Sequence, residues 1–352
     1  MPPPLTRAEV ELQALQPGAS LDRSALSRPP YLLIDAASTG AARDETQQAT
    51  IVDWLLRRPC PVIALAGRAS AVTRDALLEA CDVVVPDSAA AASLLANIER
   101  TPLAALVLVQ VLRASVRMPV AEALLLESLA YAALQSGPEF RAWLAGRRGG
   151  VPVSRLRASD GPPVLLERHA ARLQIRLNRP ERRNAISVEM RDALVEAFEL
   201  VKGDATIERV EVSGAGACFS TGGDLEEFGT CPDPATGHAV RTLRLPAVLL
   251  ASCASRVQVR LHGACIGAGM ELPAFAARVT AERNAFFQLP ELRFGLIPGA
   301  GGCVSLPRRI GRQRTAYLAL SGRRISAATA LEWGLVDALV DGQRVSGTSE
   351  IR

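Results

Sequence analysis

Lysine, histidine and aromatic residues are scarce in this sequence. Among its 352 residues there are three histidines, aromatic side chains make up 4%, and almost all of the 40 basic residues are arginine. The arginines are scattered along the chain, and 36 acidic residues reduce the net charge to +4. This pattern argues against the clustered basic surface of a nucleic-acid-binding protein. A hydrophobic content of 49% is typical of a globular chain, and the length allows two domains.

Paired metal-binding and disulfide motifs are also missing. The seven cysteines are an odd number without CxxC or CxxH spacing, which argues against a disulfide framework and a zinc site and favours a reducing compartment. The first residues do not have the pattern of a signal peptide, and the most apolar run, 102–112, is shorter than the roughly 20 residues of a membrane helix. We therefore expect a cytoplasmic protein with no metal and no membrane partner.

The first 150 residues alternate between strands and helices and then become purely helical. Residues 1–28 are predicted to form a loosely docked arm. Buried strands at 31–34, 61–65 and 82–85, with a helix near 46–56, indicate a parallel βαβ arrangement. Four helices are predicted after them, at 88–98, 102–114, 120–134 and 138–147.

A glycine- and proline-rich stretch predicts a linker over 151–163, before a second α/β block at 164–352. That block opens with a strand at 173–177 and a helix that Ser187 can cap. A strand at 209–212 follows, and a single helix is expected around 306–320.

The most informative stretch is 261–291. A strand-like run meets closely spaced glycines and then a short helical segment that holds Glu271. Glycines at such a turn let backbone N–H groups approach a ligand closely. Glu291 follows a proline at the start of a second glycine-rich run. Two carboxylates near free amides could supply an acid, a base and stabilisation of an oxyanion.

Five ordered motifs resemble the enoyl-CoA hydratase/isomerase (crotonase) superfamily over roughly 164–340. They are LNRPERRNAI, GAGACFSTGGDL, HGACIGAGMEL, LPELRFGLIPGAGG and SGRRISAATALEWGLVD. The resemblance implies a crotonase-like core built as a spiral of ββα turns, with an additional N-terminal α/β and helical region. It also implies that a CoA thioester is bound with its carbonyl oxygen between two backbone amides, with no cofactor beyond the CoA of the substrate.

By this resemblance the two amides belong to Gly223 and Ala268. The loop holding Thr221, Gly222 and Asp224 falls where the family binds CoA, although a structural cap is the favoured interpretation of Asp224. Basic side chains that could meet the CoA phosphates are expected nearby. They are Arg179, Arg182 and Arg183.

The side chains favour one reaction within the superfamily. Glu271 and Glu291 match the two glutamates of hydratases, which add water across the double bond of a 2-enoyl-CoA in fatty acid metabolism. Glu291 would exchange a proton at Cα, and Glu271 would hold or activate the water with help from the Gly299 amide. The alternatives are another crotonase reaction, namely isomerase, thioester hydrolase or C–C lyase, or a non-catalytic homologue that binds CoA esters.

Other polar residues have simpler interpretations. His262 is expected to be packed or hydrogen-bonded, and His169 and His238 are expected at the surface without partners. Cys265 and Cys303 lie near the predicted pocket, but no neighbouring base marks either as a nucleophile.

Two features depart from the family pattern. Gln258 and Arg260 replace small apolar residues in the strand before the glycine turn, which suggests an altered edge of the pocket. The helices that normally follow the core are missing from the C-terminal end, yet 82–147 look like them. We therefore interpret 1–150 as a degenerate crotonase-like region whose helices pack on the core, in cis or from a neighbouring subunit. An unrelated helical domain is the alternative, and a homotrimer or hexamer is implied by the family.

Overall fold

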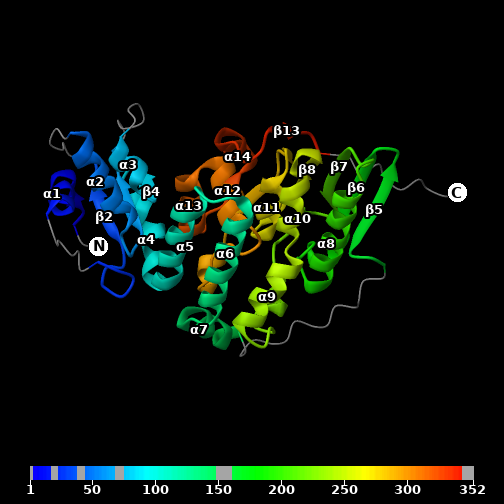
Figure 1. The fold of residues 1–352 in the computed structure, drawn as a ribbon, viewed down its shortest axis with the longest axis horizontal. Coiled ribbons are helices and arrows are strands. Elements are labelled where there is room, and N and C mark those ends of the chain that lie inside the picture. The colour runs from blue at the N-terminus through cyan, green and yellow to red at the C-terminus, as the bar shows by residue number, and fades with distance from the viewer. Residues whose placement is uncertain (1–2, 17–22, 38–43, 68–74, 148–160, 343–352) are drawn as a thin grey trace.

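The N-terminal sheet and the main sheet lie at opposite ends of the molecule, with a layer of helices between them (Figure 1). The computed structural model describes residues 3–16, 23–37, 44–67, 75–147 and 161–342. In these ranges no single helix is both long and apolar enough to cross a membrane. Only the adjoining helices Ser88–Arg100 and Pro102–Ser115, bent by 109° at their junction, reach that combination together.

The N-terminal sheet is parallel and its strands follow one another in chain order. Its strands are β1 (Leu5–Thr6), β2 (Leu32–Asp35), β3 (Val62–Leu65) and β4 (Val83–Val85), and its helices are α1 (Arg7–Leu15), α2 (Glu45–Leu56) and α3 (Ala76–Ala80). Both faces are covered, because Leu32 and Val62 pack toward α2 and α3 while Leu33 and Ile63 join the core on the other side. The predicted parallel βαβ arrangement is confirmed.

The prediction of a loosely docked arm is wrong for residues 3–16. Thr6 and Glu9 form a capping box at the start of α1, and Val10 is fully buried. Arg7 forms an ion pair with Asp75, which ties the helix to the start of α3. The strand β1 adds main-chain pairing with β2, so this segment is an integral part of the sheet.

The four predicted helices are present. They are α4 (Ser88–Arg100), α5 (Pro102–Ser115), α6 (Val120–Gln135) and α7 (Pro138–Arg147). They pack on three core helices, α9 (Pro234–Arg244), α12 (Gly302–Ile310) and α13 (Arg312–Ser321). The helical region therefore covers the core of its own chain, as expected for packing in cis. Its interpretation as part of a degenerate crotonase unit stays a prediction, and 148–160, most of the predicted linker, lie outside the described residues.

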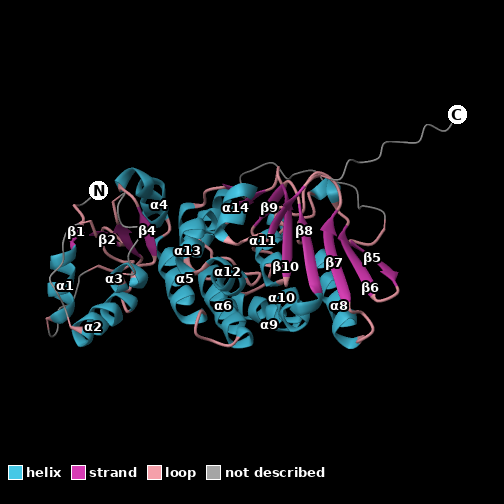
Figure 2. Ribbon diagram, turned by 90° about the horizontal axis from the view of Figure 1, so that it is seen from above, coloured by secondary structure: helices cyan, strands magenta, loops and turns pink. Residues whose placement is uncertain are grey.

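The core contains a six-stranded and a three-stranded sheet, ordered β13-β10-β8-β7-β6-β5 and β12-β11-β9. The large sheet is parallel except for the β5–β6 pair, and its strands stand side by side in Figure 2. The strands are β5 (Val164–His169), β6 (Arg172–Leu177), β7 (Arg209–Gly214), β8 (Val257–Leu261), β9 (Ala264–Ile266), β10 (Arg278–Glu282), β11 (Phe286–Gln288), β12 (Ile325–Ser326) and β13 (Ala338–Val340). The remaining helices are α8 (Val188–Gly203), α10 (Pro246–Cys253), α11 (Ala268–Glu271) and α14 (Ala327–Trp333).

Two expectations for the core need correction. The single helix expected around 306–320 is two helices, because Gly311 has a left-handed φ of 85° and turns the chain between α12 and α13. Arg260 does not alter the pocket, because β8 buries alternate residues and Arg260 lies on its other face, 3.1 Å from Glu282. The Ser187 cap is confirmed, since its side chain accepts a hydrogen bond from the Met190 amide.

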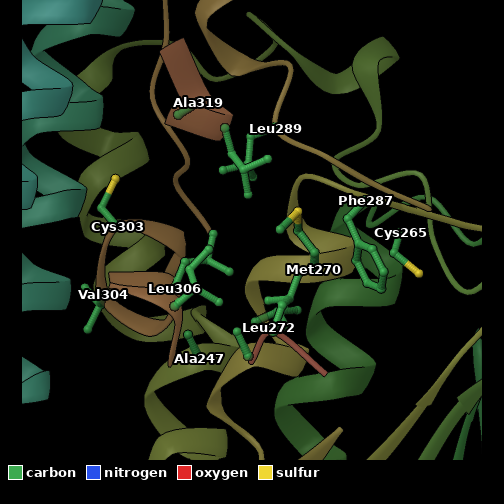
Figure 3. Packing of buried hydrophobic residues seen from close by; sticks show 14 of the residues in the cluster. Ala247, Cys265, Met270, Leu272, Phe287, Leu289, Cys303, Val304, Leu306 and Ala319 are labelled. Atoms are coloured by element: carbon green, nitrogen blue, oxygen red, sulfur yellow. The ribbon is translucent and has the colours of Figure 1, made fainter. Parts of the chain in front are cut away.

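Buried apolar side chains fix the position of α11. Met270 and Leu272 belong to the same buried cluster as Leu306 of α12 and Ala247 of α10 (Figure 3). The helix is only four residues long because Pro273 follows and a short 3-10 turn takes over. Glu271 is consequently held at the end of a short, well-packed helix rather than on a mobile loop.

Candidate active site

Two backbone amides from separate loops line one cavity of about 490 Å³. They belong to Gly223, after β7, and Ala268, at the start of α11, and neither donates a hydrogen bond to another described residue. The loops touch at Gly222, where a Cβ would lie 2.6 Å from the Ile266 carbonyl oxygen and 3.4 Å from the Ala268 nitrogen. Two unpaired N–H groups in a cavity can stabilise an oxygen that gains negative charge.

Asn184 holds the first loop in place, a role that we did not predict from the sequence. Its side-chain nitrogen lies 2.8–3.0 Å from the carbonyl oxygens of Ala215, Cys218 and Phe219, and its Oδ1 accepts from the Arg179 amide. Asn184 itself has a left-handed φ of 50°, which asparagine tolerates better than most residues. The signal was present in the motif LNRPERRNAI, but the contacts span more than 30 residues of sequence.

Glu271 lines the cavity and is buried, with 2% of the residue exposed. Its Oε2 accepts hydrogen bonds from the Ala300 amide at 2.8 Å and the Gly302 amide at 2.9 Å. Burial raises the pKa of Glu271 to about 7, and the two amides oppose this shift because they stabilise the carboxylate. Glu271 can therefore exchange a proton near neutral pH.

Glu291 reaches the same place from the short 3-10 turn Glu291–Phe294. A Cβ on Gly267 would lie 2.6 Å from Glu291 Oε1 and 3.8 Å from Glu271 Oε1, so the two carboxyl groups converge over this glycine. Glu291 Oε2 is buried and has no hydrogen-bond partner among the described residues. Burial, and next the charge of Glu271, raise the pKa of Glu291 well above its usual range.

Glu127 of α6 is a third buried acid, which sequence reasoning missed. Its two oxygens accept from the Gly301 amide at 2.7 Å and the Cys303 amide at 2.8 Å. The four consecutive amides of 300–303 thus donate alternately to Glu271 and Glu127. Burial raises the pKa of Glu127 well above its usual range, with the charge of Glu271 as the next cause. The available signal was an acid in the middle of a mainly apolar helix.

Helix α6 also supplies part of the cavity wall. The ring of Tyr131 lies against Gly299, where a Cβ would be 2.4 Å from a ring carbon. Gly299 lines the cavity beside the amides that hold Glu271, and the role of its own amide in holding water stays a prediction. The guanidinium of Arg241, on α9, stacks 4.7 Å from the centre of the Tyr131 ring.

The residues predicted to contact CoA have different roles in the structure. Thr221 and Gly222 lie in the loop that carries the Gly223 amide. Asp224 caps a short turn by accepting from the Glu226 amide at 3.0 Å, as the favoured interpretation expected, and forms an ion pair with Arg182 at 2.9 Å. Its contact with CoA stays a prediction.

The three candidate arginines differ in their surroundings. Arg179 is buried and donates to Glu189 and to two backbone carbonyls, so its guanidinium is used within the fold. Arg182 bridges Asp224 and Glu226. Arg183 is exposed, and its side chain has no hydrogen bond or ion pair to a described residue. Among these three, Arg183 is the best placed to meet a phosphate.

The histidines and cysteines follow their interpretations with two exceptions. His262 Nε2 lies 3.0 Å from the Gly216 carbonyl oxygen, which confirms a hydrogen-bonded role. His238 and His169 are not partnerless. His238 Nδ1 lies 2.9 Å from Ser128 Oγ on α6, and His169 Nε2 lies 2.8 Å from Glu167 Oε1. Burial raises the pKa of the Cys265 and Cys303 thiols, which disfavours their thiolates. No group of three or more metal-ligating side chains occurs in the described ranges.

Comparison with known proteins places this site in a family. A sequence profile described as Enoyl-CoA hydratase/isomerase matches residues 167–349. The chain is 37% identical over 182 residues to 1,2-epoxyphenylacetyl-CoA isomerase of Escherichia coli, covering 51% of this chain and 70% of the relative. It is 32% identical over 196 residues to an enoyl-CoA hydratase of Mycobacterium tuberculosis, covering 54% and 74%.

A crystal structure of enoyl-CoA hydratase from Thermoplasma volcanium is 34% identical to the chain, with a TM-score of 0.48 over 52% of this chain and 73% of the other. Each match is therefore confined to about half of this chain. The half that the profile matches contains the two cavity amides and both converging glutamates. The chain belongs to the enoyl-CoA hydratase/isomerase family of the crotonase superfamily, with an α/β fold.

Proposed function

We propose that the protein is a lyase that adds water across the 2,3-double bond of a 2-enoyl-CoA thioester. The observation that carries this proposal is the pair of buried glutamates, which differ in hydrogen bonding and converge beside two free amides. Paired acids in different surroundings divide the work of acid and base.

The amides of Gly223 and Ala268 would receive the carbonyl oxygen of the thioester. Addition of water at C3 places negative charge on that oxygen through the conjugated system. Two fixed N–H donors stabilise this charge without rearranging, and loss of one such donor typically costs about 10²–10³-fold in rate.

The hydrogen bonds of the two glutamates indicate which of them carries the proton. Glu271 accepts two amide hydrogen bonds that favour its carboxylate, whereas Glu291 Oε2 has no described donor. Glu291 therefore holds the proton and Glu271 acts as the base. Glu271 removes a proton from water, the hydroxide oxygen bonds to C3, and Glu291 protonates C2. Transfer of a proton from Glu271 to Glu291 restores the starting state.

Several features of the whole protein form part of this proposal. Arg183, Arg182 and the loop at Thr221 would contact the CoA moiety, which is part of the substrate, so no further cofactor is needed. A cytoplasmic homotrimer or hexamer follows from the family resemblance. The N-terminal helices would close the site of their own subunit, because α6 already contributes Tyr131 to the cavity wall.

The test is the loss of the absorbance of the conjugated enoyl thioester with short and medium 2-enoyl-CoAs. Glu291→Gln should reduce kcat by about 10²–10⁴-fold, because it removes the proton donor. Glu208→Gln, which changes an exposed glutamate directly before β7, is the matched control. Undiminished turnover by Glu291→Gln would exclude the assigned acid, and binding of CoA esters without hydration would exclude the hydratase.

Isomerisation is the second candidate, supported by the 37% identity to a relative named as an isomerase. Moving a double bond needs one group that takes a proton and returns it to another carbon, and Glu291 could do both. Product analysis distinguishes the reactions, because hydration adds the mass of water and isomerisation leaves the mass unchanged.

A further inference from the structure

A cationic side chain lies in the wall of the same cavity without an acidic partner. Arg241 of α9 lines the cavity together with Tyr131 and Gln135 of α6. Its Nε donates to Ser128 Oγ at 3.0 Å, and its Nη1 and Nη2 donate to Gln135 Oε1 and the Ser128 carbonyl oxygen at 3.3 Å. All three acceptors are neutral groups.

Some N–H groups of the Arg241 guanidinium are not used in these hydrogen bonds and are available to a ligand. A guanidinium has five N–H donors, and these bonds use one on each nitrogen. In the described ranges no carboxylate lies within ion-pair distance of Arg241. Burying a cation is unfavourable unless it is paired, and burial also lowers the pKa of Arg241. An anion would complete this environment.

The acidic groups elsewhere in the cavity lining do not fill that role. Asp224 pairs with Arg182 at 2.9 Å. Glu227 accepts a hydrogen bond from the Val188 amide at 2.8 Å. Neither Glu271 nor Glu291 forms an ion pair with Arg241, whose guanidinium packs on the Tyr131 ring. The charge of the buried Glu127 acts on Arg241 from beyond ion-pair distance, so Arg241 is left without a direct acidic partner.

Arg241 is also held in position by its neighbours. Ser128 Oγ lies 2.9 Å from His238 Nδ1, so the acceptor of the Arg241 Nε–H is fixed from α9 as well as α6. The Tyr131 ring supports the flat face of the guanidinium at 4.7 Å. Apolar side chains, including Val240 and Leu245, line the cavity nearby. Such a surface suits a methylene chain that ends in an anion.

We propose that Arg241 binds a carboxylate at the far end of the acyl chain, so that the preferred substrate is an ω-carboxyacyl-CoA. This inference rests on the proposed function for the orientation of the thioester, with its carbonyl at Gly223 and Ala268. The chain would leave that point, pass Tyr131 and end at the guanidinium. Hydrogen bonds between charged groups then add to the affinity.

The first experiment compares 2-hexenoyl-CoA with 5-carboxy-2-pentenoyl-CoA, in which a carboxylate replaces the terminal methyl group of the same chain. We expect the wild type to favour the carboxylate by about tenfold to a hundredfold in kcat/KM, the range for charged hydrogen bonds. Arg241→Gln should abolish this ratio. Arg244→Gln, an exposed arginine on the same helix, should leave it unchanged.

A second experiment measures binding of hexanoyl-CoA and adipyl-CoA, which lack the double bond, by calorimetry. Tighter binding of adipyl-CoA, lost in Arg241→Gln, supports the inference even if no hydration is detected, so failure of the proposed reaction is seen separately. Equal binding of both esters by the wild type would overturn it. An equal loss of both in Arg241→Gln would also overturn it, since that result indicates a structural arginine.

Discussion

Buried carboxylates occur in two regions of this molecule, and their surroundings differ. Asp82, where the N-terminal sheet meets the core, is 1% exposed and forms ion pairs with Arg113 and Arg312. Its Oδ2 also accepts from the Val62 amide at 2.8 Å. At and next to the cavity, the carboxyl groups of Glu127, Glu271 and Glu291 have backbone amides or no described partner, and no described basic side chain lies within ion-pair distance of them.

This difference separates a structural acid from reactive ones. Arg312 also donates to the carbonyls of Glu79 and Cys81 at the end of α3, so the charged cluster joins α13 to the N-terminal sheet. A fully paired acid keeps its charge and stabilises one geometry. Acids buried without cations have raised pKa values and can transfer protons near neutral pH. Buried carboxyl groups thus stabilise the fold where basic side chains pair with them, and can transfer protons where no basic side chain does.

The largest effect is expected from neutralising a reactive acid. Glu271→Gln should lower kcat by about 10²–10⁴-fold, because the base that activates water is lost while the side-chain shape is kept. The free energy of unfolding, measured in urea, should not fall, since a buried charge is removed. If Glu271→Gln instead unfolded readily and kept its activity per folded molecule, the two regions would not differ as we describe.

The next effect concerns the paired acid. Asp82→Asn should lower the free energy of unfolding by about 3–5 kcal/mol, because Arg113 and Arg312 would remain buried without their counter-charge. Urea denaturation followed by circular dichroism measures this loss. Turnover at low temperature by the folded fraction should match the wild type, because Asp82 does not line the cavity. A loss of kcat without a loss of stability would contradict the structural role.

Local sequence signals correctly predicted the helices that lie between the N-terminal sheet and the core. The helix expected at 102–114 is observed as Pro102–Ser115, because proline at its first turn and its apolar residues define it without distant contacts. The motif spacing likewise selected Glu271 and Glu291, and the structure brings their carboxyl groups together. Most of the secondary structure and the central pair were therefore accessible from sequence.

Contacts between residues far apart in the chain could not be predicted from the sequence. Glu127 and the Gly301 amide are 174 residues apart, and Ser128 and His238 are 110 apart. Neither pair leaves a spacing pattern, because each depends on how α6 packs against the core. Asp82 was recognised only as part of a strand, since its two arginines lie 31 and 230 residues away.

A smaller effect should appear in the dependence of stability on pH. Burial raises the pKa values of Glu127, Glu271 and Glu291 in the folded state, so folding favours their protonated forms. Their stabilisation is complete below the unfolded pKa of about 4.5 and is lost as pH rises, through about 7 for Glu271. Each proton that the folded state binds and the unfolded state does not lowers the free energy of unfolding by about 1.4 kcal/mol for each unit by which the pH rises.

Glu127→Gln should make this slope shallower, by up to about 1.4 kcal/mol per pH unit between pH 5 and 7. The slope is the readout because glutamine has one acceptor oxygen, so an amide of Gly301 or Cys303 loses its partner and absolute stability falls in any case. Urea denaturation at several pH values gives both quantities. An unchanged slope would show that Glu127 is charged in the folded protein.

The smallest effect is expected at Arg260, which tests whether an ion pair outside both regions matters. Its guanidinium lies 3.1 Å from Glu282 and 3.0 Å from the Asp341 carbonyl oxygen, and its side chain is 34% exposed. Partly exposed pairs contribute little, so Arg260→Ala should lower the free energy of unfolding by about 1 kcal/mol or less. It should leave kcat/KM unchanged, because β8 directs Arg260 away from the cavity. A tenfold loss of kcat/KM would show that the charge in this strand does shape the site, and the contrast between paired and unpaired acids would then be too simple.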